Sequence, residues 1–254
     1  MTQVKNLKDL PTLSKLGTIN SLLATENATG KSYRMSAADL KKELGSISID
    51  DVMDNVFIMC HRSSDSYPVC YRPSEWAAQE AAGDVATGVL LIDGGRKLVI
   101  APQEKTSIWS TCQLECGTKQ ADRLLAQELY NGKENCAKIL TNTTLAAEGD
   151  ASAVGWCNAY ERINAGGKGL KAGAWWLPSL GELYLIFANF TKINYALSKI
   201  SGATLLSKTA YWSCTEYSAT DAWFLYFGDG SQFNYRKSAR QSRVRPVSAF
   251  AMAT

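Results

Sequence analysis

The chain has 254 residues, of which 46% are hydrophobic and 20% charged, which is ordinary for a soluble globular protein with one large or two smaller cores. Its net charge of +3 is too small to require nucleic acid or an acidic membrane as a partner. No segment approaches the ~18 uninterrupted apolar residues of a membrane span, and the start lacks the apolar core of a signal peptide. The sequence therefore predicts synthesis in a cytoplasm, no standard export and no membrane insertion.

Residues 1–50 are predicted to form a small N-terminal module. Leucines recur every third residue near its start, but Pro11 would break a helix there. Ser36 can cap a short helix that turns Leu40 and Leu44 inward. So short a segment buries little apolar surface alone, so we expect it to lean on the main domain, on a symmetry mate or on a larger assembly.

After a predicted linker at residues 45–50, strands are followed by helices and then by strands again. The expected strands are 56–59, 88–92, 97–101, 210–213, 222–227 and 243–250, and the expected helices are 119–131, 152–164 and 179–190, with a further turn or two at 193–200. Gly94-Gly95 is a strong hairpin signal, and Ser179 with Glu182 fits a capping box. Without βαβ alternation, this order predicts an α+β domain over residues 51–254, with an antiparallel sheet, two or three helices and much irregular loop.

The cysteines and the single histidine do not predict a metal site. Seven cysteines at irregular spacing indicate free thiols used as small apolar residues, and Cys157 is expected in the core. Cys112 and Cys116 could form half a zinc site, but no second pair matches their spacing. His61, which any Ser/His/Asp arrangement would need, lies in a polar loop. We therefore expect no metal, no cofactor and no enzyme activity.

Four segments carry motifs of a known family in the family's order. They are Gly88–Ala101, Trp175–Leu183, Tyr211–Tyr217 with Cys214 in place of a usual serine, and Val244–Phe250. Together they cover roughly residues 55–250 and resemble bacterial C-type-lectin-like domains of the formylglycine-generating-enzyme type. The closing part looks most like the variable proteins of diversity-generating retroelements. In that family, miscopying of template adenines rewrites codons near the end of the gene, which here implies a variable region at about 211–250.

The resemblance implies fixed framework residues with arbitrary residues between them. The framework would be Trp223, Leu225, Phe227, Gly230 and Lys237, and strand alternation likewise sends the first three to the core. Phe224 and Tyr226 would then face outward, followed by Phe233, Tyr235 and Arg236 in a stretch without helical or strand period. Exposed aromatic and arginine side chains are typical of a binding hot spot. The candidate ligand-binding residues are Tyr217, Thr220, Asp221, Phe224, Tyr226, Asp229, Gln232, Phe233, Asn234, Tyr235, Arg236, Ser238 and Arg240.

Simpler interpretations of these residues stay open. The aromatic residues could be core or sheet-surface residues. The basic cluster formed by Arg236, Lys237, Arg240, Arg243 and Arg245 could indicate DNA or RNA. Arg243 and Arg245 match the family framework, where such arginines pair with carboxylates or carbonyls, so we expect no nucleic-acid partner. The same fold also hosts formylglycine-generating enzymes, which use paired cysteines and copper, but Cys214 has no cysteine near it in sequence.

The resemblance implies a receptor-binding or adhesin protein that contacts a protein or glycan on a host cell surface. Residues 10–40 resemble the start of many phage tail and virion proteins, so we expect a phage particle, with residues 1–50 joining other virion proteins and the chain forming a homo-oligomer, a trimer first. A bacterial cytoplasm or cell surface is the alternative location. An enzyme of the formylglycine-generating type and an undiversified structural virion protein are the alternative functions.

Overall fold

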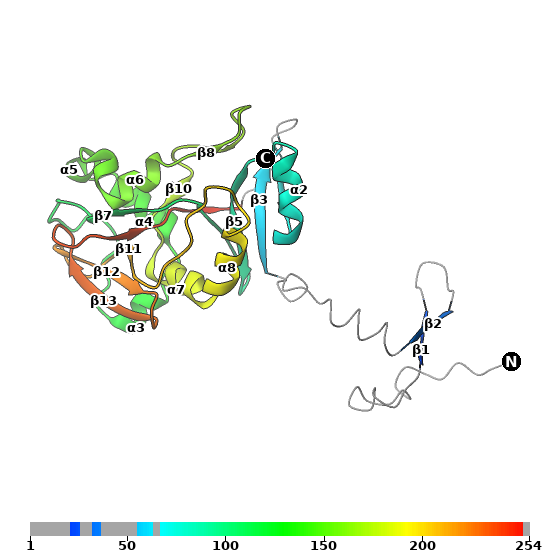
Figure 1. Ribbon diagram of the computed structural model, residues 1–254. Helices are drawn as coiled ribbons and strands as arrows, with labels where there is room; N and C mark the ends of the chain where they lie inside the picture. The colour runs from blue at the N-terminus through cyan, green and yellow to red at the C-terminus, as the bar shows by residue number, and fades with distance from the viewer. Residues whose placement is uncertain (1–20, 26–31, 37–54, 63–66, 251–254) are drawn as a thin grey trace. The chain divides into compact units, whose positions relative to one another are not determined.

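The computed structural model describes residues 21–25, 32–36, 55–62 and 67–250 (Figure 1). The chain divides into two units, Met1–Val52 and Met53–Thr254. In the first unit, strands β1 (Ser21–Thr25) and β2 (Ser32–Ser36) pair in antiparallel fashion. The helix expected after Ser36 and the linker expected at residues 45–50 lie outside the described residues.

The second unit contains two larger sheets and one small one. The six-stranded sheet has the order β10-β15-β6-β5-β3-β4, and all its neighbouring strands are antiparallel. Its strands are β3 (Val56–His61), β4 (Pro68–Tyr71), β5 (Ala86–Asp93), β6 (Arg96–Ile100), β10 (Trp175–Trp176) and β15 (Val247–Ala249). The last strand of the described residues, β15, therefore lies inside this sheet, between β10 and β6.

The five-stranded sheet has the order β13-β12-β11-β14-β7, so β13 is an edge strand. Its strands are β7 (Lys105–Ser107), β11 (Ala210–Glu216), β12 (Asp221–Tyr226), β13 (Ser231–Arg236) and β14 (Ser242–Val244). The pairing of β11 with β14 is parallel and the other pairings are antiparallel. A separate short hairpin joins β8 (Arg162–Ile163) and β9 (Gly169–Leu170).

Helices occupy the middle of the chain, so the predicted α+β class is confirmed. The α-helices are α2 (Trp76–Ala81), α3 (Arg123–Gln127), α4 (Gly132–Ile139), α5 (Thr143–Ala146), α6 (Ala153–Ala159), α7 (Leu180–Ala188) and α8 (Phe190–Leu197), and two 3-10 turns lie at Pro73–Glu75 and Gly149–Ala151. The expected two or three helices are too few, because seven α-helices lie within the described ranges. Two of the additional ones, α2 and α5, have only six and four residues.

A helix occurs within the expected range 119–131, but it is much shorter than predicted. The Asp122 side chain accepts hydrogen bonds from the backbone N–H groups of Leu124 and Leu125, so α3 begins there and ends at Gln127. Asn131, expected as a helix end, occupies the N-cap position of α4, without a side-chain capping hydrogen bond. The expected apolar stripe fails because Leu125 is exposed, whereas Ala126 is buried. The helix expected at 152–164 is shorter than predicted, since α6 ends at Ala159.

The hairpin and capping signals are confirmed. Gly94 and Gly95 have φ values of 55° and 77°, as a two-residue turn between β5 and β6 requires. At the start of α7, the Ser179 side chain and the Glu182 carboxylate accept reciprocal backbone hydrogen bonds.

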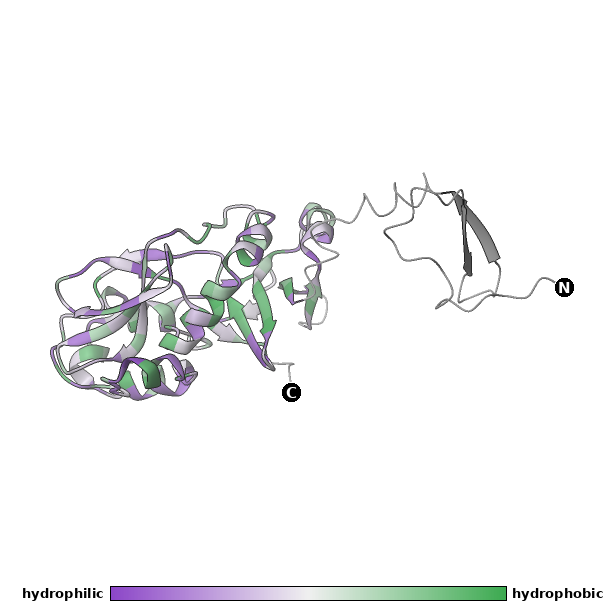
Figure 2. Ribbon diagram, turned by 90° about the horizontal axis from the view of Figure 1, so that it is seen from below, coloured by the Kyte–Doolittle hydropathy of each residue, from purple (hydrophilic) through white to green (hydrophobic). Residues whose placement is uncertain are grey.

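One core joins both sheets to the helices (Figure 2). Its large buried side chains include Trp76, Trp109, Trp212, Tyr211 and Phe227. Helix α7 contacts β11 and β12, and α8 contacts β3 and β5. Helix α7 therefore supports the hairpin of β12 and β13 from its inner side.

Ser179 also donates a hydrogen bond to the backbone oxygen of Leu129, at 2.7 Å. Replacing Ser179 with alanine removes both the cap and this buried contact, so we expect the free energy of unfolding to fall by about 1–2 kcal/mol. Urea denaturation checks this, with Ser198→Ala, at the exposed end of α8, as the control. Equal effects of the two substitutions would show that the capping box contributes nothing.

Candidate binding surface

The hairpin of β12 and β13 has two different faces. Its register places Phe224 opposite Phe233 and Leu225 opposite Gln232, and opposite residues share a face. Trp223, Leu225 and Phe227 are buried, which confirms their expected inward direction. The stretch after Phe227, expected to lack a strand period, forms β13 instead.

The outer face of the hairpin surrounds an open hollow of about 500 Å³. It is lined by Phe224, Tyr226, Asp229, Phe233, Asn234, Tyr235 and Arg240. Three of its rings are exposed: 52% of Phe233, 47% of Tyr235 and 38% of Tyr226. The structure thus brings these seven predicted residues together on one surface.

Phe224 forms the floor of this hollow and is buried, so its expected exposure is wrong. Its ring meets Trp212 edge to face at 5.7 Å and stacks on Phe233, also at 5.7 Å. The Arg240 guanidinium lies 4.5 Å from the centre of the Phe224 ring and 5.5 Å from that of Tyr235. These contacts cover Phe224, while the outer sides of the other rings stay open to solvent.

Gln232 is also buried, so its prediction as an exposed ligand contact is wrong. Its side-chain amide donates to the backbone oxygen of Arg123 at 2.8 Å and accepts from the Tyr184 hydroxyl at 2.7 Å. Gln232 therefore ties β13 to α3 and α7. Strand alternation places Gln232 on the same face as Leu225, so its burial would follow from the sequence if β13 were predicted as a strand.

The remaining predicted residues lie toward the other end of the hairpin. Thr220 donates to Asp221 at 2.6 Å in the turn before β12, and the half-buried Tyr217 meets Trp223 edge to face at 5.2 Å. A second hollow of about 370 Å³ is lined by Asp221, Asn234, Tyr235, Arg236 and Ala239. Ser238 is exposed and accepts a hydrogen bond from Gln113 at 2.8 Å.

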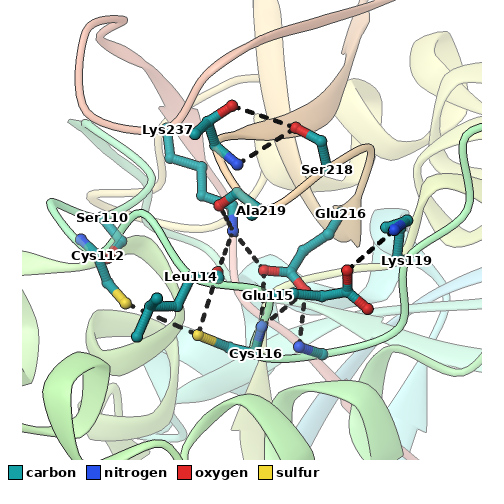
Figure 3. A network of polar contacts seen from close by, with 12 residues as sticks. Ser110, Cys112, Leu114, Glu115, Cys116, Lys119, Glu216, Ser218, Ala219 and Lys237 are labelled. Carbon is teal, nitrogen blue, oxygen red and sulfur yellow. Dashed lines mark hydrogen bonds and ion pairs between the residues drawn. The ribbon is translucent and has the colours of Figure 1, made fainter.

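A fully buried ion pair, Lys237 with Glu216, lies at the end of β13 (Figure 3). The Lys237 ammonium donates to the Glu216 carboxylate, and to the backbone oxygens of Leu114 and Ala219 at 2.8 Å each. The same ammonium lies 4.6 Å from the centre of the Trp109 ring. Lys237 was expected among the fixed framework residues, and its burial agrees with that expectation, whereas its partner Glu216 was missed.

Glu216 also fixes the loop between β7 and α3. Its carboxylate accepts from the backbone N–H groups of Cys116, at 3.1 Å, and Gly117, at 2.6 Å. Gly230, the other expected framework position, has a φ of 78°, and an added Cβ would lie 2.6 Å from the Phe187 ring. A side chain at 230 would therefore be strained and would collide with the core.

Two arginines of the basic cluster, Arg243 and Arg245, have structural partners. Arg245 is buried and donates to Glu104 at 2.6 Å and to the backbone oxygens of Ala101 and Thr204 at 2.9 and 2.8 Å. Arg243 approaches the same Glu104 carboxylate at 3.5 Å. Their expected structural pairing with carboxylates and carbonyls is confirmed.

The thiols are arranged as core groups. Cys214 has a spatial neighbour that the sequence did not predict, because Cys136 of α4 lies beside it. Burial, with a smaller effect of Cys136, raises the pKa of Cys214 well above its usual value. Such a thiol stays protonated and is a poor nucleophile at neutral pH. No group of three metal-binding side chains occurs in the described part of the chain.

His61 shares a short contact with Thr87, 2.8 Å between Nδ1 and the hydroxyl oxygen. Burial lowers the pKa of His61. Among the residues with assigned positions, no helix has both the length and the apolar character needed to cross a membrane.

Comparisons with known proteins give little. No protein-family model matches the sequence, and no curated protein matches it. A fimbrial protein from Bacteroides ovatus ATCC 8483 is structurally similar, with a TM-score of 0.40 and 16% sequence identity. The match covers 61% of this chain and 36% of that one, so the chain matches only about a third of the fimbrial protein's length.

Proposed function

We propose that this chain is a non-enzymatic ligand-binding protein whose second unit has a C-type-lectin-like fold and binds through the outer face of the β12–β13 hairpin. The observation that carries this proposal is the contrast between buried and exposed residues along β13 and directly after it. Gln232 and Lys237 are buried, while the residues between them, 233–236, are all exposed. Two buried residues thus bracket four consecutive side chains that the core does not use.

The chemistry of the displayed residues supports recognition of a partner. Tyrosine and phenylalanine offer a large, rigid contact area at low cost in conformational entropy, and arginine and asparagine add directed hydrogen bonds. Exposed aromatic rings around a hollow of about 500 Å³ contribute little to folding stability, because water covers their outer sides. Clustered rings of this kind mark an interaction site.

We further propose that a retroelement diversifies these residues and that the protein lies on a phage particle. A retroelement rewrites codons within residues 211–250, and the buried framework tolerates the changes because the rewritten side chains lie outside it. The chain is a receptor-binding protein on a phage particle, joined to other virion proteins through residues 1–50 and present as a trimer. Several weak contacts to a host protein or glycan then add through multivalency.

Two matched libraries test the recognition surface. One randomises Tyr226, Phe233, Tyr235 and Arg236, and the other randomises Trp223, Phe227, Gln232 and Lys237. We expect most members of the first library to keep a melting temperature within about 5 °C of the parent and to yield binders to several immobilised proteins and glycans. Members of the second library are expected to unfold. If the first library unfolds equally often, the hairpin is scaffold and the surface is not a binding site.

The gene's neighbourhood tests diversification separately. We expect a reverse transcriptase gene and a near-copy of the codons for residues 211–250, which differs almost only where the copy has adenine. Absence of both would leave an undiversified virion protein, whatever the libraries show.

A further inference from the structure

The loop between β7 and α3 brings two thiols together. The sulfur atoms of Cys112 and Cys116 are 3.8 Å apart, and both residues are free cysteines (Figure 3). Both are buried, at 4% and 8% exposure, while the three residues between them are exposed. The two thiols therefore point inward from a loop whose middle residues are exposed.

Separate carboxylates hold the two cysteine backbones in place. Glu148 accepts from the N–H of Cys112 at 2.9 Å, and Glu216 accepts from the N–H of Cys116 at 3.1 Å. Glu148 follows α5, whereas Glu216 ends β11. The two cysteine backbones are thus anchored independently, with their sulfur atoms close but not bonded. If the two sulfur atoms approached each other by less than 2 Å, they would reach the ~2.05 Å of a disulfide bond.

We propose that Cys112 and Cys116 form a reversible redox site, which closes as an intramolecular disulfide by exchange with a small disulfide such as oxidised glutathione. One cysteine thiolate attacks the glutathione disulfide, forming a mixed disulfide and releasing one glutathione thiolate, which takes up the proton the cysteine lost. The second cysteine, as its thiolate, then displaces the other glutathione, which takes up the second proton. Two thiols are oxidised and one glutathione disulfide is reduced, so electrons and protons balance.

The other cysteines do not share this arrangement. Cys136 and Cys214 are also neighbours, but both belong to the core between α4 and β11. Cys60 and Cys70, on the paired strands β3 and β4, are close enough for Cys70 to contribute to the raised pKa of Cys60, but Cys70 is only half-buried and both belong to the sheet instead of a loop. Burial raises the pKa of Cys116 to about 12, so oxidation should be slow at neutral pH and should accelerate as the pH rises.

Closing the disulfide would stiffen a loop that contacts two residues directly after β13, Lys237 and Ser238. Within the loop, the backbone oxygen of Leu114 accepts from Lys237, and the Gln113 side chain donates to Ser238. A bond from 112 to 116 would enclose both contacts in a small ring. The disulfide would lower the conformational entropy of the loop in the unfolded chain. The oxidised protein should therefore melt on the order of 5 °C higher than the reduced one.

Mass spectrometry tests the site. The folded full-length chain is incubated with oxidised glutathione, alkylated under denaturing conditions and digested with trypsin. Cleavage after Lys105 and Lys119 leaves both cysteines in one peptide, residues 106–119. We expect this peptide to be unalkylated and lighter by two hydrogen atoms. Cleavage after Glu115 should give two fragments that stay linked until a reductant is added.

Matched variants decide the outcome. In Cys112→Ser and Cys116→Ser, the internal disulfide and the rise in melting temperature should both disappear, while Cys70→Ser should behave as the parent. Thermal melting of the reduced forms checks that the serine variants fold. The proposal is overturned if both thiols of the parent are fully alkylated, or if glutathione adducts accumulate equally in the parent and the single variants.

Discussion

Replacing Lys237 with methionine is expected to lower the free energy of unfolding by about 3–5 kcal/mol, because it leaves the Glu216 carboxylate buried without its counter-charge. Lys237 and Glu216 are both 0% exposed, so water cannot replace the lost partner. The backbone oxygens of Leu114 and Ala219 lose a donor at the same time. Urea denaturation of purified protein measures the change.

Two further variants interpret that result. Lys171→Met removes an exposed lysine and should change stability by no more than about 0.5 kcal/mol. A double variant, Lys237→Met with Glu216→Gln, removes both charges and should recover part of the loss. A loss below about 1 kcal/mol for Lys237→Met alone would show that the ion pair is not an anchor of the hairpin.

Two phenylalanines of the hairpin region should respond very differently to alanine. Phe227 is 2% exposed, and its ring stacks on Tyr211 at 4.4 Å and packs against Phe187 at 5.7 Å. Removing it creates a cavity between the sheet and α7, so we expect a loss of about 3–5 kcal/mol. Phe233 keeps about half of its surface in water and has one stacking contact, so its loss should be about 0.5–1 kcal/mol.

Equilibrium unfolding of Phe227→Ala and Phe233→Ala makes this comparison within one region. Equal losses would mean that the outer face of the hairpin is part of the core. The proposal of a changeable recognition surface would then fail, because a rewritten residue at 233 would unfold the protein.

The sequence predicts best where local chemistry decides the structure. The turn at Gly94-Gly95 and the capping box at Ser179 are set by residues within a few positions of one another, and both occur as predicted. The alternation along β12 predicts the inward side chains because one face of that strand meets the core. Phe224 departs from it, since Phe233 and Arg240 cover its ring from later positions in the chain.

Prediction fails where local signals compete and where residues far apart in the sequence determine the structure. The leucines near residue 125 have helical spacing, but the Asp122 cap and the start of α4 at Gly132 restrict the helix to one short turn. The ion pair between Glu216 and Lys237 could not be predicted, because the sequence does not show which carboxylate pairs with a buried lysine. The short distance between Cys112 and Cys116 depends on Glu148 and Glu216, which come from separate elements.

The position of β15 inside the six-stranded sheet has a consequence for synthesis of the protein. Val247–Ala249 are translated after the β12–β13 hairpin, yet they join β10 to β6 in the six-stranded sheet. A chain that stops early leaves two strands with unsatisfied backbone groups in the sheet interior and cannot complete its fold. A chain that ends before or within the hairpin also lacks β15, so we expect only chains translated through the entire hairpin region to reach the native state.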